Sequence, residues 1–175
     1  MLHTADLGRT LLASWRTNER VTAFLVEHLP RTLWNASLPA ASHRTVRMVA
    51  AHFHNSRSRW IKTLGQEYGI VPPTLVDRHR VARRELLAAL ERSGRGIESL
   101  LELGIANGGQ VPASKTYVWR NLPLDVGHVL TYFVAHEAHH RGQLVMIARE
   151  LGRPLPRQVL DGLWQWTIRV KEQAG

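Results

Sequence analysis

Residues 133–145 read Phe-Val-Ala-His-Glu-Ala-His-His-Arg-Gly-Gln-Leu-Val, and they form the middle of a long predicted helix. The helix follows Pro123 and continues to Leu151, where Gly152-Arg153-Pro154 supplies a stop signal. Apolar residues stand on both sides of the histidine-rich centre. The histidines therefore lie where a helix packs against its neighbours, and not at its end.

Further helices are predicted on both sides of this one, because apolar residues recur there at steps of three and four. Pro30 ends the first helix and Thr45 caps the second. The predicted helices cover Asp6–Leu29, Thr45–Leu64, about Leu75–Leu103 and Arg157 to about Glu172. Loops are predicted over Arg31–Arg44, Gly65–Pro73 and Ala106–Asn121, the last with a short extended piece at Thr116–Trp119. We expect an all-α fold, an up-and-down four-helix bundle with an additional C-terminal helix, in one domain spanning residues 1–175.

Glycines interrupt two of these helices. Gly94 and Gly96 weaken the middle of the third helix, since each Gly costs about 1 kcal/mol relative to Ala. Gly142 is expected to permit close helix packing.

The composition excludes several kinds of chemistry. The 175 residues contain no cysteine, which rules out a disulfide framework, a cysteine zinc site and a cysteine nucleophile. A net charge of +9 admits an anionic partner. The densest basic group lacks the interleaved aromatic residues of a nucleic-acid surface, so we expect a solvated face and no nucleic acid. This group comprises Arg78, Arg80, Arg83 and Arg84. The sequence shows no export signal or membrane-spanning run, which predicts a cytoplasmic protein without a membrane partner.

Two histidines of the quoted stretch are spaced to bind one metal ion. His136 and His140 stand at positions i and i+4, on one helix face and about 5–6 Å apart at Cβ. Neutral imidazole binds zinc, nickel, iron or copper. A third ligand would come from elsewhere: His52 and His54 flank the apolar stripe of the second helix on opposite sides, and periodicity does not choose between them. The plain alternative is a polar helix face with solvated histidines.

The same residues match the pattern HExxH, in which Glu137 would be the general base of a zinc metallopeptidase. The longer form of that motif needs a Gly and a third His downstream, where this chain has Gln143 and Met146. No strand is predicted that could form the edge of a substrate cleft. The peptidase is therefore kept as a second alternative.

The residues that combine these features resemble the DinB/YfiT-like family of small four-helix-bundle metalloproteins. The resemblance rests on residues 135–143 and 51–55, on Trp60 eight positions after His52, and on residues 162–166. It implies that His52, His136 and His140 bind a divalent metal ion, nickel or zinc. An alignment shifted by two residues would put His54 in place of His52. The family also includes thiol S-transferases and isomerases that use low-molecular-weight thiols, and its members often form homodimers.

From this resemblance we expect a metal-dependent enzyme of the thiol S-transferase or isomerase type, acting on a small-molecule substrate as a homodimer. The first alternative is a metal-binding or stress-related protein without turnover. Glu137 would orient a ligand or act as a catalytic base, unless it only pairs with Arg141 on the helix surface. Arg141 would clamp an acidic cosubstrate or be solvated.

Overall fold

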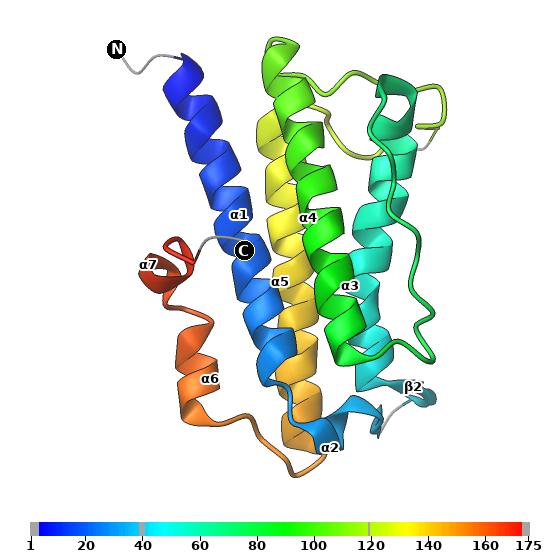
Figure 1. Ribbon diagram of the computed structural model, residues 1–175, viewed down its shortest axis with the longest axis vertical. Coiled ribbons are helices and arrows are strands. Elements are labelled where there is room, and N and C mark those ends of the chain that lie inside the picture. The colour runs from blue at the N-terminus through cyan, green and yellow to red at the C-terminus, as the bar shows by residue number, and fades with distance from the viewer. Residues whose placement is uncertain (1–3, 39–40, 119, 173–175) are drawn as a thin grey trace.

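Four long helices lie side by side in the computed structural model (Figure 1), which describes residues 4–38, 41–118 and 120–172. They are α1 (Thr4–His28), α3 (Val46–Trp60), α4 (Arg83–Ala106) and α5 (Val126–Glu150). The shorter elements are α2 (Arg31–Trp34), β1 (Ser37–Leu38), β2 (Ala41–Thr45), the π-helix η1 (Ile61–Gly65), the 3₁₀ helix η2 (Gln66–Tyr68), α6 (Arg157–Gly162) and α7 (Trp166–Arg169). The two strands form one small antiparallel sheet. The predicted all-α class is confirmed.

The helix ends follow the capping signals of the sequence. Thr45 caps α3 as predicted, because its side chain accepts a hydrogen bond from the Met48 amide at 3.3 Å. Asp125 caps α5 in the same way through the His128 amide at 3.0 Å. Gly152 follows α5 with a φ of +66°, a left-handed conformation that favours glycine at the end of a helix.

The third predicted helix begins later than expected, at Arg83 instead of about Leu75. The preceding segment, residues 69–82, runs back along α3 in an irregular conformation (Figure 1). Polar side chains of α3 bind its backbone. Asn55 donates to the Val76 carbonyl at 3.1 Å and accepts from the Val76 amide at 3.0 Å. These two hydrogen bonds satisfy the backbone amide and carbonyl of Val76, which have no helical partners.

This returning segment changes the course of the chain. Because it carries the chain back along α3, α4 runs parallel to α3, while α1 and α5 run in the opposite direction (Figure 1). The contacts agree with this parallel direction, because a later residue on the α3 side meets a later residue of α4. Arg57 donates to the Leu90 carbonyl at 3.0 Å, and Ile61 packs against Gly96. The expected strictly up-and-down course is therefore wrong, because it assumed a short connection between antiparallel helices.

Two loops, the C-terminal helix and one glycine also differ from the prediction. The predicted loop at Arg31–Arg44 contains α2, β1 and most of β2, and the predicted C-terminal helix is divided into α6 and α7. Residues 116–118 form no strand, and Trp119 lies outside the described residues. A Cβ on Gly96 would lie 2.5 Å from Ile61 Cδ1, so this glycine serves packing between α3 and α4. Gly142 has no atom within 4 Å of such a Cβ, so its predicted packing role is wrong.

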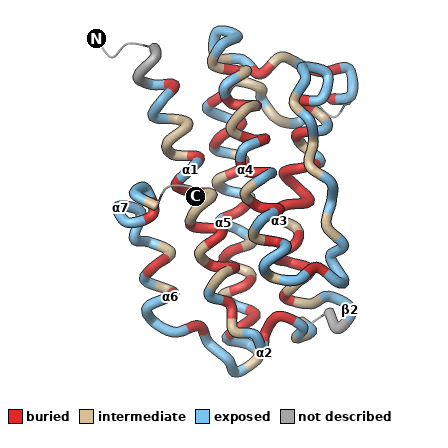
Figure 2. Tube along the Cα trace, viewed as in Figure 1, coloured by how far each residue is buried: buried red, intermediate tan, exposed pale blue. Residues whose placement is uncertain are grey.

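The core consists of two apolar clusters with a polar layer between them. One cluster includes Phe53, Leu90 and Leu144, and the other includes Trp15 and Phe133. Figure 2 shows the buried residues running along the facing sides of the long helices. The buried polar side chains between the clusters belong to Asn18, Thr22, Arg57, Ser93, Glu137 and Arg141. Among the described helices, none has the length and apolar character needed to cross a membrane.

Candidate metal centre

Three histidines meet between α3 and α5. His52 comes from α3, and His136 and His140 come from adjacent turns of α5. His136 Nε2 lies 3.2 Å from His52 Nε2 and 3.2 Å from His140 Nε2. One potential ligand atom from each of the three side chains falls within 4.8 Å of the others. The predicted pair is therefore brought together with a third imidazole, in an arrangement that could hold a metal ion.

The environment keeps these imidazoles uncharged. Burial, followed by the neighbouring His140 and His136, lowers the pKa of His52 from 6.5 to about 4. Burial also lowers the pKa of His136, with His140 contributing, and it lowers the pKa of His140 despite a hydrogen bond that opposes the shift. Neutral imidazole is the form that binds a metal. The donor set therefore fits a divalent cation near neutral pH.

A glutamine fixes the orientation of one potential ligand. Gln143 Oε1 accepts from His140 Nδ1 at 2.8 Å, and Gln143 Nε2 donates to His139 Nε2 at 2.9 Å. An amide oxygen only accepts, so the proton of neutral His140 lies on Nδ1. This leaves the lone pair on His140 Nε2 directed at the cluster. Metal-binding histidines are commonly held in this way.

Aromatic side chains pack against the imidazoles. The Tyr132 ring stacks on His136 with centroids 5.8 Å apart and an interplanar angle of 14°. Trp60 Nε1 donates to the Tyr132 hydroxyl at 3.2 Å. The Phe53 ring meets His140 edge to face at 6.1 Å. These contacts restrict the imidazole rings and remove part of their surface from water.

The structure separates the alternatives for the third histidine. His54 is buried, and its Nε2 lies 2.9 Å from the Thr74 carbonyl in the segment that returns along α3. His54 therefore anchors the segment that connects α3 to α4, and it lies outside the histidine cluster. His128 is exposed and binds Asp125 at the start of α5. Only His52 accompanies His136 and His140 among the described residues.

Glu137 points into the buried polar layer and is held by four hydrogen bonds. Its carboxylate accepts from Arg57 Nε at 2.6 Å and Nη2 at 2.9 Å, from Asn18 at 2.9 Å and from Thr22 at 2.6 Å. Burial opposes ionisation, but Arg57, Thr22 and Arg141 together outweigh it, and the pKa of Glu137 lies below its usual value. Because the carboxylate is buried and already accepts four hydrogen bonds, this geometry supports a positioning role and gives no support to a catalytic base.

Arg141 also lies in this layer. Its Nη1 donates to Asn18 at 3.0 Å and to Thr22 at 2.6 Å, and it lies 3.7 Å from Glu137. Burial lowers the pKa of Arg141, with Glu137 opposing the shift. The expected solvated side chain is therefore wrong, and the geometry gives no support to a clamp for a cosubstrate.

Sequence reasoning missed Arg57, the main partner of Glu137. Its side chain is 1% exposed and stacks over Trp15 at 5.0 Å. A signal was present: Arg57 stands four residues after Phe53 and four before Ile61, on the apolar stripe of its helix. Glu137 interrupts the stripe of α5 in the same way, four residues after Phe133. Opposite charges on two apolar stripes predict a buried ion pair.

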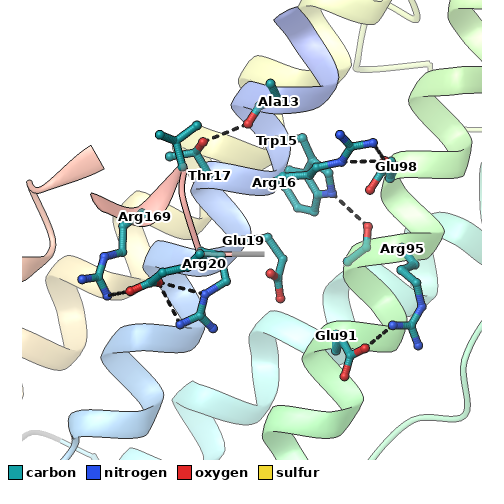
Figure 3. A pocket seen from close by; sticks show the side chains of 13 residues that line it. Ala13, Trp15, Arg16, Thr17, Glu19, Arg20, Glu91, Arg95, Glu98 and Arg169 are labelled. Carbon is teal, nitrogen blue, oxygen red and sulfur yellow. Dashed lines mark hydrogen bonds and ion pairs between the residues drawn. The ribbon is translucent and has the colours of Figure 1, made fainter. Parts of the chain in front are cut away.

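A pocket of about 520 Å³ lies between α1, α4 and the C-terminal segment (Figure 3). Its charged lining residues are largely paired, as Arg16 with Glu98 and Arg95 with Glu91. Glu19 lies between the two helices and is 3.9 Å from Arg57. None of the three clustered histidines lines this pocket, so the site with metal-binding chemistry is the histidine cluster.

Comparison with known proteins identifies one family. The family model described as "DinB family" matches residues 1–169. No curated protein matches the chain. The match covers α1 through α7 and includes all three clustered histidines.

Proposed function

The chain belongs to the DinB family, and on this premise we propose that His52, His136 and His140 bind a divalent metal ion, nickel or zinc. We further propose that the protein is a metal-dependent enzyme of the thiol S-transferase or isomerase type that acts on a small molecule. The observation that carries the proposal is the convergence of three imidazoles within 4.8 Å. Three protein ligands leave a coordination position for water or substrate, as catalytic sites do.

A divalent ion held there would lower the pKa of a bound thiol or water, or polarise a carbonyl. The chain itself has no cysteine, so any sulfur nucleophile must come from a low-molecular-weight thiol cosubstrate. The residues around the site provide its preorganisation. Gln143 fixes His140, and the Tyr132 ring supports His136.

Paired alanine variants test the metal site. His52→Ala should lose bound nickel or zinc, measured by mass spectrometry of the purified protein, because one of three imidazoles is removed. His54→Ala is the matched control two residues away, and it should keep the metal because its imidazole binds the Thr74 carbonyl. Full metal retention in both variants would overturn the proposed ligand set.

Turnover needs a separate assay. The metal-loaded protein should form a thioether product from an electrophile and one of the thiols mycothiol, bacillithiol or glutathione, and His52→Ala should not. Metal binding without a thiol-dependent product from any pair would support the alternative of a metal-binding protein without turnover. Chelator-sensitive peptide cleavage would instead support the metallopeptidase.

The homodimer and the cytoplasmic location are parts of the same proposal. Apolar side chains at the C-terminal end support the former: Trp164 is 84% exposed, and Ile168 and Val170 are also exposed. Sedimentation of the full chain should show a dimer. A four-helix bundle formed by α1, α3, α4 and α5 would give such a dimer a helical interface.

A further inference from the structure

Three arginines that the proposed function does not use line a second pocket. This pocket measures about 350 Å³ and lies between α2 and the beginning of α4. Its lining residues are Arg31, Trp34, Asn35, Arg83, Arg84 and Leu87. None of them belongs to the histidine cluster. The pocket is therefore a separate feature of the molecule.

The positive charge of this pocket is not compensated. No acidic side chain is among its lining residues, and neither Arg31 nor Arg84 forms an ion pair with any part of the chain that the structure describes. By contrast, Arg20 and Arg169 near the first pocket both bind Glu172. Guanidinium groups stay protonated at neutral pH. Three positive charges around one cavity repel one another, and an anion bound between them offsets that repulsion.

Arg83 is fixed in position by its surroundings. Its Nη1 donates to the Glu27 carbonyl at 3.3 Å, and its guanidinium lies 5.5 Å from the centre of the Trp34 ring. Trp34 is itself held by a hydrogen bond from Nε1 to the Val81 carbonyl at 3.3 Å. Arg83 Nε is buried and has no hydrogen-bond partner among the described atoms. The protein therefore orders this guanidinium without satisfying all of its donors.

We infer that this pocket binds the phosphate group of a small phosphorylated molecule. A phosphomonoester carries about −1.5 to −2 charges and three strong acceptor oxygens, which suits three guanidinium groups better than a carboxylate with two oxygens. Arg83 and Arg84 are the first two residues of α4, so the positive end of that helix dipole adds to the attraction. Trp34 and Leu87 supply an apolar wall for the group that carries the phosphate.

The basic group at residues 78–84 has two parts with different surroundings. Arg83 and Arg84 line the pocket, whereas Arg78 and Arg80 are exposed and do not. Arg80 lies 3.8 Å from the Asp77 carboxylate. The two halves have equal charge but different surroundings. They therefore offer a matched comparison between a defined pocket and a diffusely basic surface.

The experiment compares two double variants of the full-length protein. Arg31→Gln/Arg84→Gln removes two exposed arginines of the pocket, and Arg78→Gln/Arg80→Gln removes two outside it. Circular dichroism should show that both fold, since neither changes a buried side chain. Binding of inorganic phosphate and of glycerol 3-phosphate is measured by isothermal titration calorimetry, with a fluorescently labelled DNA duplex as a third probe.

We expect saturable, one-to-one binding of both phosphate probes to the unmodified protein. The pocket variant should weaken this binding by at least about 10-fold, because charge-assisted hydrogen bonds are lost. The control variant should stay within about twofold. Equal weakening in the two variants, or no saturable binding of either phosphate probe, would overturn the inference. DNA binding that exceeds that of both small probes and falls equally in the two variants would show a nucleic-acid surface instead.

Discussion

Replacing Glu137 by glutamine separates a positioning role from a catalytic one. The carboxylate holds Arg57 through two hydrogen bonds of 2.6 and 2.9 Å inside the core. Glutamine has almost the same shape but no charge, and its NH₂ group would face the donors that now point at Glu137. The substitution also leaves two buried guanidinium groups without this carboxylate, and Glu19 lies 3.9 Å from Arg57 but forms no ion pair with Arg141. We therefore expect a large loss of stability.

The size of this loss follows from the burial of the pair. The side chains of Arg57 and Glu137 are only 1% and 2% exposed, so water cannot replace the lost partner. Removing one member of a buried ion pair costs about 3–5 kcal/mol. For a chain of this length, each kcal/mol lowers the melting temperature by about 2–4 °C, so a decrease of roughly 6–20 °C is expected.

The assay is thermal and urea unfolding of Glu137→Gln beside Glu91→Gln. Glu91 pairs with Arg95 on the surface, with side chains 41% and 61% exposed, and such pairs contribute at most about 1 kcal/mol. A loss in Glu137→Gln no larger than that of Glu91→Gln would refute the reasoning. A catalytic base would give the reverse pattern: unchanged stability and abolished turnover.

Three further predictions concern the site and its supports. Gln143→Leu should lower metal affinity by about 10- to 100-fold because His140 Nδ1 loses its acceptor, whereas Gln143→Glu should keep most of the affinity. Competition with a chromophoric chelator measures the metal affinity of both variants. In the metal-free protein the NMR signal of His52 should titrate near pH 4 instead of 6.5. Since His52 binds a proton more tightly in the unfolded chain, the free energy of unfolding should decrease as the pH falls from about 6.5 to 4. An NMR titration midpoint of 6.5 for His52 would contradict its burial. Gly96→Ala should destabilise by about 1–3 kcal/mol through overpacking, and Gly142→Ala should be neutral or stabilise by up to about 1 kcal/mol, as urea unfolding would show.

Local features of the fold could be predicted from the sequence, but the relative direction of the helices could not. The cap at Thr45 and the shared face of His136 and His140 depend only on neighbouring residues, and both are present in the structure. The direction of α4 depends on residues 69–82. A helix is predicted from about Leu75, but Asn55 of α3 binds the backbone of Val76 instead. That competition is tertiary, so helical periodicity alone does not detect it.

The choice between two histidines of α3 has the same origin. His52 and His54 flank the apolar stripe symmetrically, so their assignment requires knowledge of which neighbour lies on which side. In the structure α5 lies beside His52, and the returning segment lies beside His54. Only the resemblance to a family favoured His52, since it carries information about tertiary arrangement that one sequence does not.

The buried polar layer explains how the histidines are kept in register. Along α5, Glu137 follows His136 and Arg141 follows His140, so each charged side chain points about 100° around the helix from a histidine. Glu137 is bound by Arg57 from α3 and by Thr22 from α1, which fixes the rotation of α5 against both helices. An apolar layer would pack as well in several rotations, because apolar contacts are not directional. The directional hydrogen bonds of Glu137 allow one rotation, and in that rotation His136 and His140 face His52.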